Sequence, residues 1–168
     1  MIGSYLIFAG LGFILISTFT AHYNQNYLEQ YYAAALRRES SQIADSFGNS
    51  CYRSELTLEE FQKQIAAVSS YLDADIYIVT TGGRVLITSE QYIRPSETES
   101  IKDFDILDFS GSNYSIGTFY DHYDDDVLTV YTPITRSYKV TCYAIICLPL
   151  SHITTLQYDL LNGFYLSL

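Results

Sequence analysis

The sequence predicts an α+β fold, in which an antiparallel sheet of about five strands packs with a long N-terminal helix and a transmembrane helix precedes this unit. Three observations lead to this prediction. In residues 1–28, His22 is the only Asp, Glu, Lys, Arg or His, and most of the run is apolar. A stripe of apolar residues at helical spacing follows it. After Asp75, β-rich runs alternate with turn residues.

The composition limits the function classes open to the chain. Its 168 residues accommodate one folded unit and an anchoring segment, and its 48% apolar content can supply a core. Nineteen acidic residues against nine basic ones give a net charge of -10. A nucleic-acid binder needs a basic face, so we expect no nucleic-acid partner. Seventeen tyrosines without tryptophan predict sheet faces that are half buried and half wet.

Three cysteines form neither a disulfide framework nor a zinc pattern. Cys142 and Cys147 are five residues apart in a predicted strand and therefore point to opposite faces, so they cannot bridge each other. A bond from Cys51 to one of them stays open. We expect three unpaired, mostly buried thiols, and no cofactor.

Residues 1–23 are predicted to form the transmembrane helix. The run is long enough to cross the hydrocarbon layer, and Tyr5 and Tyr23 lie near its ends, where interfacial aromatics belong. The alternatives are a cleaved signal peptide or a buried core helix, and the absence of Lys or Arg before the run weakens the first. The acidic character of the rest favours a cell-membrane protein whose residues after about 23 are extracytoplasmic.

Two helices are predicted before the sheet. Apolar residues at helical spacing run from Leu28 to Phe47, interrupted at Glu39 and Ser40, and Gly48 with Asn49 should end this helix. The stripe comprises Leu28, Tyr31, Tyr32, Ala35, Leu36, Ile43 and Phe47. Thr57 and Glu60 then form a capping box, followed by apolar residues at steps of three and four through Leu72.

The strands follow in two groups. Residues 76–80 and 85–89 form a hairpin around a Gly-Gly turn, and residues 90–115 form a loop holding a short helix. Three further antiparallel strands are predicted at 116–120, 127–134 and 138–148, and Pro149 ends the last one. Residues 150–168 should be helical, with 159–168 as the start of a second, truncated transmembrane helix. The folded domain would therefore span residues 24–158.

This order of elements resembles the PAS-like Cache sensor domains found outside the membrane in bacterial sensor histidine kinases. The local similarity lies in DIYIVTTGGRVLITS (75–89) and in VLTVYTPITRSYKVTCYAIICLPL (127–150), and the order matches over nearly the whole chain. One departure is Cys142 before Tyr143, where such receptors often carry Gly. The resemblance implies a module that binds a small molecule or a protein and relays a helix displacement through the membrane to a cytoplasmic kinase.

No catalytic or metal-binding pattern is found. The three histidines are dispersed, and no nucleophile, base and orienting group can be assembled from their spacing. The acidic run from Asp121 to Asp126 lacks the alternation that wraps Ca²⁺, so a solvated connection is expected. The turn from Thr81 to Arg84 precedes a strand instead of a helix, which favours a β-turn over a phosphate loop. We expect this segment to be no enzyme and to hold no metal.

The resembled fold carries its ligand pocket on one face of the sheet. Strand alternation places Val127, Thr129 and Tyr131 on one face and Leu128, Val130 and Thr132 on the other. The face that packs against the helices should be the more apolar one. As candidate ligand-binding residues we select three tyrosines and two arginines, of which the loop arginine would clamp a carboxylate. They are Arg94, Tyr120, Tyr131, Arg136 and Tyr143.

The expected function is the sensing module of a membrane-bound two-component histidine kinase. A homodimer through the long N-terminal helix would let small helix shifts bias the output. A chemotaxis-receptor ectodomain would have the same segment order, and the sequence does not separate the two. A pilin-like binding or structural protein is the third possibility, but pilins need an acidic residue early in the apolar helix and the first carboxylate here is Glu29.

Overall fold

The computed structural model describes residues 2–52, 57–90, 99–109 and 114–153. The side chains of residues 2–10, 17–25 and 50–52 lie outside this description. The chain divides into two compact units, residues 1–32 and 33–168. No helix within the described part is long and apolar enough to cross a membrane. The transmembrane helix predicted over 1–23 stays a prediction, and the segment 159–168 lies outside the described residues.

Helix α1 (Ile2–Tyr52) makes up the first unit and contributes its C-terminal part to the second. The buried side of this part is formed by Ala33, Leu36, Ser40, Ile43, Ala44 and Phe47. The predicted stripe is therefore right at Leu36, Ile43 and Phe47 and wrong at Tyr31, which is 63% exposed. Ser40 continues the stripe instead of interrupting it, because its buried hydroxyl donates to the Ala144 carbonyl at 3.0 Å.

The predicted end of this helix at Gly48 and Asn49 is wrong, since α1 continues to Tyr52. A glycine ends a helix when it adopts a left-handed conformation, and among the described glycines only Gly83 and Gly117 have positive φ. A side chain at Gly48 would meet Ile134 Cγ2 at 3.9 Å, which places this turn of the helix on strand β4.

Helix α2 (Leu58–Leu72) begins at the predicted capping box. The Glu60 amide donates to Thr57 Oγ1 at 3.2 Å, and the Thr57 amide donates to Glu60 Oε2 at 2.8 Å. Phe61 and Ile65 are its buried residues, and the Phe61 ring meets that of Phe47 edge-on at 5.1 Å. The apolar spacing read from the sequence therefore buries one side of α2 against α1 and the sheet.

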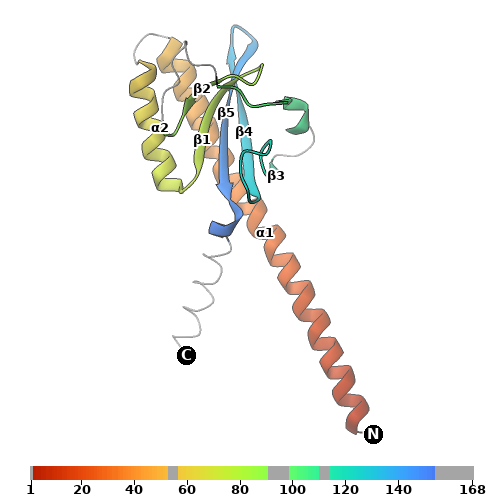
Figure 1. The fold of residues 1–168 in the computed structure, drawn as a ribbon. Coiled ribbons are helices and arrows are strands. Elements are labelled where there is room, and N and C mark those ends of the chain that lie inside the picture. The colour runs from red at the N-terminus through yellow and green to blue at the C-terminus, as the bar shows by residue number, and fades with distance from the viewer. Residues whose placement is uncertain (1, 53–56, 91–98, 110–113, 154–168) are drawn as a thin grey trace. The chain divides into compact units, whose positions relative to one another are not determined.

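Five antiparallel strands form one sheet in the order β2-β1-β5-β4-β3 (Figure 1). The strands are β1 (Asp75–Thr80), β2 (Val85–Thr88), β3 (Ser115–Gly117), β4 (Val127–Arg136) and β5 (Lys139–Pro149). A 3-10 helix, η1 (Ile106–Phe109), lies in the loop where a short helix was predicted. The predicted α+β class with a long N-terminal helix and about five strands is thus confirmed.

The third predicted strand, 116–120, is too long. Strand β3 ends at Gly117, and Phe119, Tyr120 and Asp121 follow with φ of 46°, 56° and 57°. These values lie in the left-handed region, where no strand can continue. The aromatic residues that suggested a strand instead form a tight turn.

The two faces of the sheet differ as predicted. The face toward α1 and α2 is apolar and fully buried, and carries Ile76, Ile78, Ile87, Leu128, Val130, Ala144 and Ile146. The opposite face carries Tyr77, Val79, Thr129, Tyr131, Tyr143, Ile145 and Cys147. Cys142 and Cys147 are free and buried on opposite faces, as expected, whereas the Cys51 side chain is not described.

Candidate functional site

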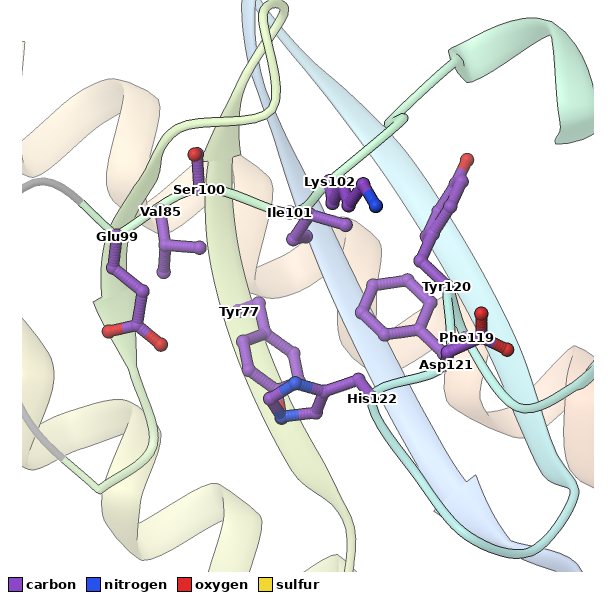
Figure 2. Close-up of a pocket in the computed structure, with 10 residues that line it drawn as sticks. All are labelled: Tyr77, Val85, Glu99, Ser100, Ile101, Lys102, Phe119, Tyr120, Asp121 and His122. Carbon is purple, nitrogen blue, oxygen red and sulfur yellow. The ribbon is translucent and has the colours of Figure 1, made fainter.

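A cavity of about 220 Å³ lies on the tyrosine-bearing face of the sheet (Figure 2). Three parts of the chain line it: the β1–β2 hairpin, the segment 99–102 and the turn after β3. The lining residues are Tyr77, Val85, Glu99, Ser100, Ile101, Lys102, Phe119, Tyr120, Asp121 and His122.

The segment 99–102 is held against the hairpin by backbone hydrogen bonds. The Val85 amide donates to the Glu99 carbonyl and the Ile101 amide donates to the Gly83 carbonyl, each at 2.9 Å. Gly83 has φ of 81°, and a Cβ there would lie 2.8 Å from Phe104 Cβ. The glycine that turns the hairpin therefore also lets the next segment approach closely enough to wall the cavity.

The turn 118–122 supplies four lining residues from a strained backbone. Three consecutive non-glycine residues in the left-handed region cost about 1–2 kcal/mol each. The turn is closed by the His122 and Tyr123 amides, which both donate to the Thr118 carbonyl at 3.1 Å. The buried Phe119 ring packs against Tyr77 at a centroid distance of 5.8 Å. Burial of this ring offsets part of the strain and fixes the side chains around the cavity.

The hydroxyl groups of the cavity tyrosines are engaged in hydrogen bonds. Tyr120 Oη donates to the Asp105 carbonyl at 2.9 Å and accepts from the Asp105 amide at 3.2 Å. Tyr123 Oη donates to Asp75 Oδ2 at 2.7 Å and lies 2.8 Å from Tyr77 Oη. The single hydroxyl proton of Tyr123 is donated to Asp75, so in the bond between the two tyrosines Tyr77 is the donor and Tyr123 the acceptor. Burial raises the pKa of both Tyr77 and Tyr123, so both hydroxyls stay protonated.

Below this chain of hydroxyls, Cys147 is completely buried. Its sulfur lies 3.6 Å from Thr129 Oγ1, and burial raises the pKa of the thiol to about 12. A thiol nucleophile reacts as thiolate, so Cys147 is a core residue with no nucleophilic role at neutral pH.

The site residues selected from the sequence lie in different places. Tyr120 lines the cavity. Tyr131 and Tyr143 meet edge-on at 6.3 Å beside it, and Tyr143 also packs against Phe104 at 6.3 Å. Arg136 is exposed at the end of β4, and Arg94 lies outside the described residues. Whether any of the five contacts a ligand is not tested, so their role stays a prediction.

Most of the lining was not selected from the sequence. Tyr77 could have been found by alternation along its strand, which places it on the same face as Val79. Phe119, Asp121 and His122 carry no such signal. A turn with left-handed backbone is usually predicted from Gly or Asn in the sequence, and residues 118–122 contain neither. Glu99 and Lys102 join them because Glu99 pairs with Val85 and Ile101 pairs with Gly83, and only the folded chain specifies these pairings.

The described residues contain no group of three His, Cys, Asp or Glu side chains that could hold a metal ion. His122 lines the cavity, edge-on to Tyr77 at 5.9 Å and to Tyr123 at 5.1 Å, and Figure 2 shows its ring in front of Tyr77. These contacts are ring packing. The arrangement offers a place to bind a small molecule.

No protein-family model matches the chain, and no curated protein matches it. Among solved structures, the chain is similar to the sensory domain of the Campylobacter jejuni chemoreceptor Tlp3, with a TM-score of 0.54 and 14% identity over 79% of this chain and 59% of that one. The isoleucine-bound form of that domain gives a TM-score of 0.52 and 16% identity, over 79% of this chain and 58% of that one. The chain has the fold of a chemoreceptor sensory domain. The resemblance stated from the sequence is thereby confirmed at the level of fold.

The chain spans less than two thirds of the length of these domains. The V. cholerae histidine kinase DctB sensor domain gives a TM-score of 0.44 and 14% identity over 80% of this chain and 57% of that one.

Proposed function

We propose that the chain is the extracytoplasmic sensing module of a membrane-bound signalling receptor, with no enzymatic activity of its own. The observation that carries the proposal is the cavity on the tyrosine-bearing face of the sheet, in a fold shared with a sensory domain. The strained turn 118–122 and the segment 99–102, which pairs with the hairpin, form its walls. Strained backbone persists where the surrounding structure holds it, and such segments cluster at ligand sites. The neighbouring Tlp3 domain binds isoleucine, L-valine and L-norvaline, which supports a small-molecule ligand here.

The output is proposed to be a two-component histidine kinase, to which occupancy of the cavity is relayed through transmembrane helices. A chemoreceptor output is the second candidate, and the likeness to Tlp3 favours it. The parent reading frame beyond Leu168 separates the two. A second span followed by a helix with a phosphorylatable His and an ATP-binding domain supports the kinase, whereas a methyl-accepting coiled coil supports the chemoreceptor. A stop codon at Leu168 would contradict both.

Sensing itself is tested by ligand binding to the full chain. A panel of small metabolites is screened for an increase in melting temperature, since a ligand that binds only the folded state stabilises it. Each hit is then measured with Ile101→Trp, which fills the cavity. The control is Leu107→Trp, which changes a residue that is 67% exposed in η1 of the same loop. We expect Ile101→Trp to abolish the stabilisation and Leu107→Trp to retain it; equal stabilisation of both would place the ligand elsewhere.

A further inference from the structure

The ligand's charge can be inferred from the cavity, provided that the cavity is the sensing site proposed above. The two tyrosine hydroxyls of its lining have no proton left to donate. Tyr120 uses its proton on the Asp105 carbonyl, and Tyr77 uses its proton on Tyr123. Tyr77 must be the donor because the Tyr123 proton is held by the Asp75 carboxylate. Tyr77 is left with an acceptor lone pair, which suits a ligand that donates.

The charged side chains of the lining point to the same ligand chemistry. Among the described lining residues, Glu99 and Asp121 contribute two carboxylates, and Lys102 contributes one ammonium. Asp121 accepts from Thr118 Oγ1 at 3.3 Å and retains further acceptor positions. An anionic ligand would face two like charges and find its partner in Lys102, which Figure 2 shows directed toward Tyr120. A cationic ligand would be attracted by either carboxylate, which Figure 2 shows on opposite sides of the cavity, in a chain whose net charge is -10.

The uncharged part of the lining is aromatic and aliphatic. Tyr77, Phe119 and Tyr120 present rings, and Val85 and Ile101 add aliphatic surface. Aromatic rings attract cations through the negative potential over their faces. The same rings pack against an apolar body, so the lining suits a molecule with both parts.

We propose that the cavity selects a small organic amine in its ammonium form, with a compact apolar body, over the carboxylate of the same shape. The ammonium group binds to an acceptor of the lining, either the Tyr77 oxygen or one of the carboxylates, and the apolar body packs on the rings. Asp75 and Tyr123 act as positioning residues, since they hold the Tyr77 proton away from the ligand.

Three probes that share one isobutyl body test the proposal: isopentylamine, L-leucine and 4-methylpentanoate. Isopentylamine carries an ammonium group, 4-methylpentanoate carries a carboxylate, and L-leucine carries both. Binding to the full chain is measured by calorimetric titration and melting temperature, with ammonium chloride as the control for ionic strength. We expect isopentylamine to bind about tenfold or more tightly than L-leucine, the gain that follows from losing one repelled carboxylate, and 4-methylpentanoate to give no shift.

Variants assign the preference to named groups. Asp121→Asn should weaken isopentylamine binding about tenfold, because it removes a charged acceptor. Tyr123→Phe should lower the ratio of amine to carboxylate affinity, because it frees the Tyr77 proton to donate. Lys102→Gln should raise amine affinity. The control Asp125→Asn makes the same charge change at an exposed residue outside the lining and should leave the ratio unchanged.

Tighter binding of L-leucine or 4-methylpentanoate than of isopentylamine would overturn this ligand class and leave the sensing function in place. An unchanged affinity ratio in Asp121→Asn and Tyr123→Phe would also overturn it. Absence of binding by all three probes at millimolar concentration would do the same, and the metabolite screen with Ile101→Trp would then decide the sensing function separately.

Discussion

Ser40 links helix α1 to strand β5 of the sheet by a buried hydrogen bond. It is completely buried, and its hydroxyl donates to the carbonyl of Ala144 at 3.0 Å. We expect Ser40→Ala to lower the free energy of unfolding by about 1 kcal/mol, the net contribution of one intramolecular hydrogen bond. Urea unfolding measures the change. Ser41→Ala on the exposed side of the same helix is the control, and an equally large loss there would contradict the role of the hydrogen bond.

The buried thiol of Cys147 makes the free energy of unfolding depend on pH in the alkaline range. Burial raises the pKa of its thiol from 9.0 to about 12, so the folded state keeps a proton that the unfolded state releases between these values. The stabilisation is complete below pH 9.0 and is lost as the pH rises toward about 12. In this window the free energy of unfolding should fall by about 1.4 kcal/mol per pH unit for this group.

Urea titrations of the wild type and Cys147→Ala across this window test the effect. Tyr77 and Tyr123 also have raised pKa values and contribute to the slope of both proteins. The difference between the two slopes therefore belongs to Cys147. Identical slopes would contradict a buried, protonated thiol.

At the scale of the element, the turn between β4 and β5 is a two-residue loop with both residues in the left-handed region. Ser137 and Tyr138 have φ of 48° and 63°, the combination for which glycine is strongly preferred at the second position. Tyr138 is fully exposed, so its ring contributes no packing that would offset the strain. We expect Tyr138→Gly to raise the free energy of unfolding by about 0.5–1 kcal/mol.

The control applies the same change to Tyr71, which is 86% exposed but lies in helix α2. Glycine in a helix loses conformational entropy on folding, so Tyr71→Gly should destabilise the chain. Opposite signs for the two substitutions in thermal unfolding would support the assignment to backbone strain. A loss of stability in both would refute it.

At the scale of the whole molecule, we expect a parallel homodimer through α1. Leu36 packs in the core and offers no surface to a partner, whereas Tyr27 and Tyr31 are exposed one helical turn apart. Tyr31→Cys should therefore give a disulfide-linked dimer under mild oxidation of the full chain, and Tyr71→Cys on α2 should not. Sedimentation of the unmodified chain measures the association directly. A monomer in sedimentation, without crosslinking at Tyr31, would exclude this dimer.

Part of the candidate site was predictable. Strand alternation places Tyr131 on the tyrosine-bearing face of the sheet, and the Gly-Gly turn correctly predicts the β1–β2 hairpin. The sequence of the turn at Phe119 predicts a strand, because aromatic residues favour strands and residues 118–122 contain no glycine. Its left-handed backbone is held by contacts of Phe119 with Tyr77 and of Tyr123 with Asp75, which are far away in sequence.

The elements whose signals are local could be predicted from the sequence. The capping box at Thr57, the helical spacing of α2 and the alternation of the strands act between near neighbours, and they gave the α+β class and the apolar face. The residues that surround the cavity, and the positions of their protons, depend on the folded chain. The reason is physical: the segment 99–102, the turn 118–122 and the relay from Tyr77 to Asp75 depend on hydrogen bonds and ring contacts between distant segments, which form once the sheet has brought those segments together.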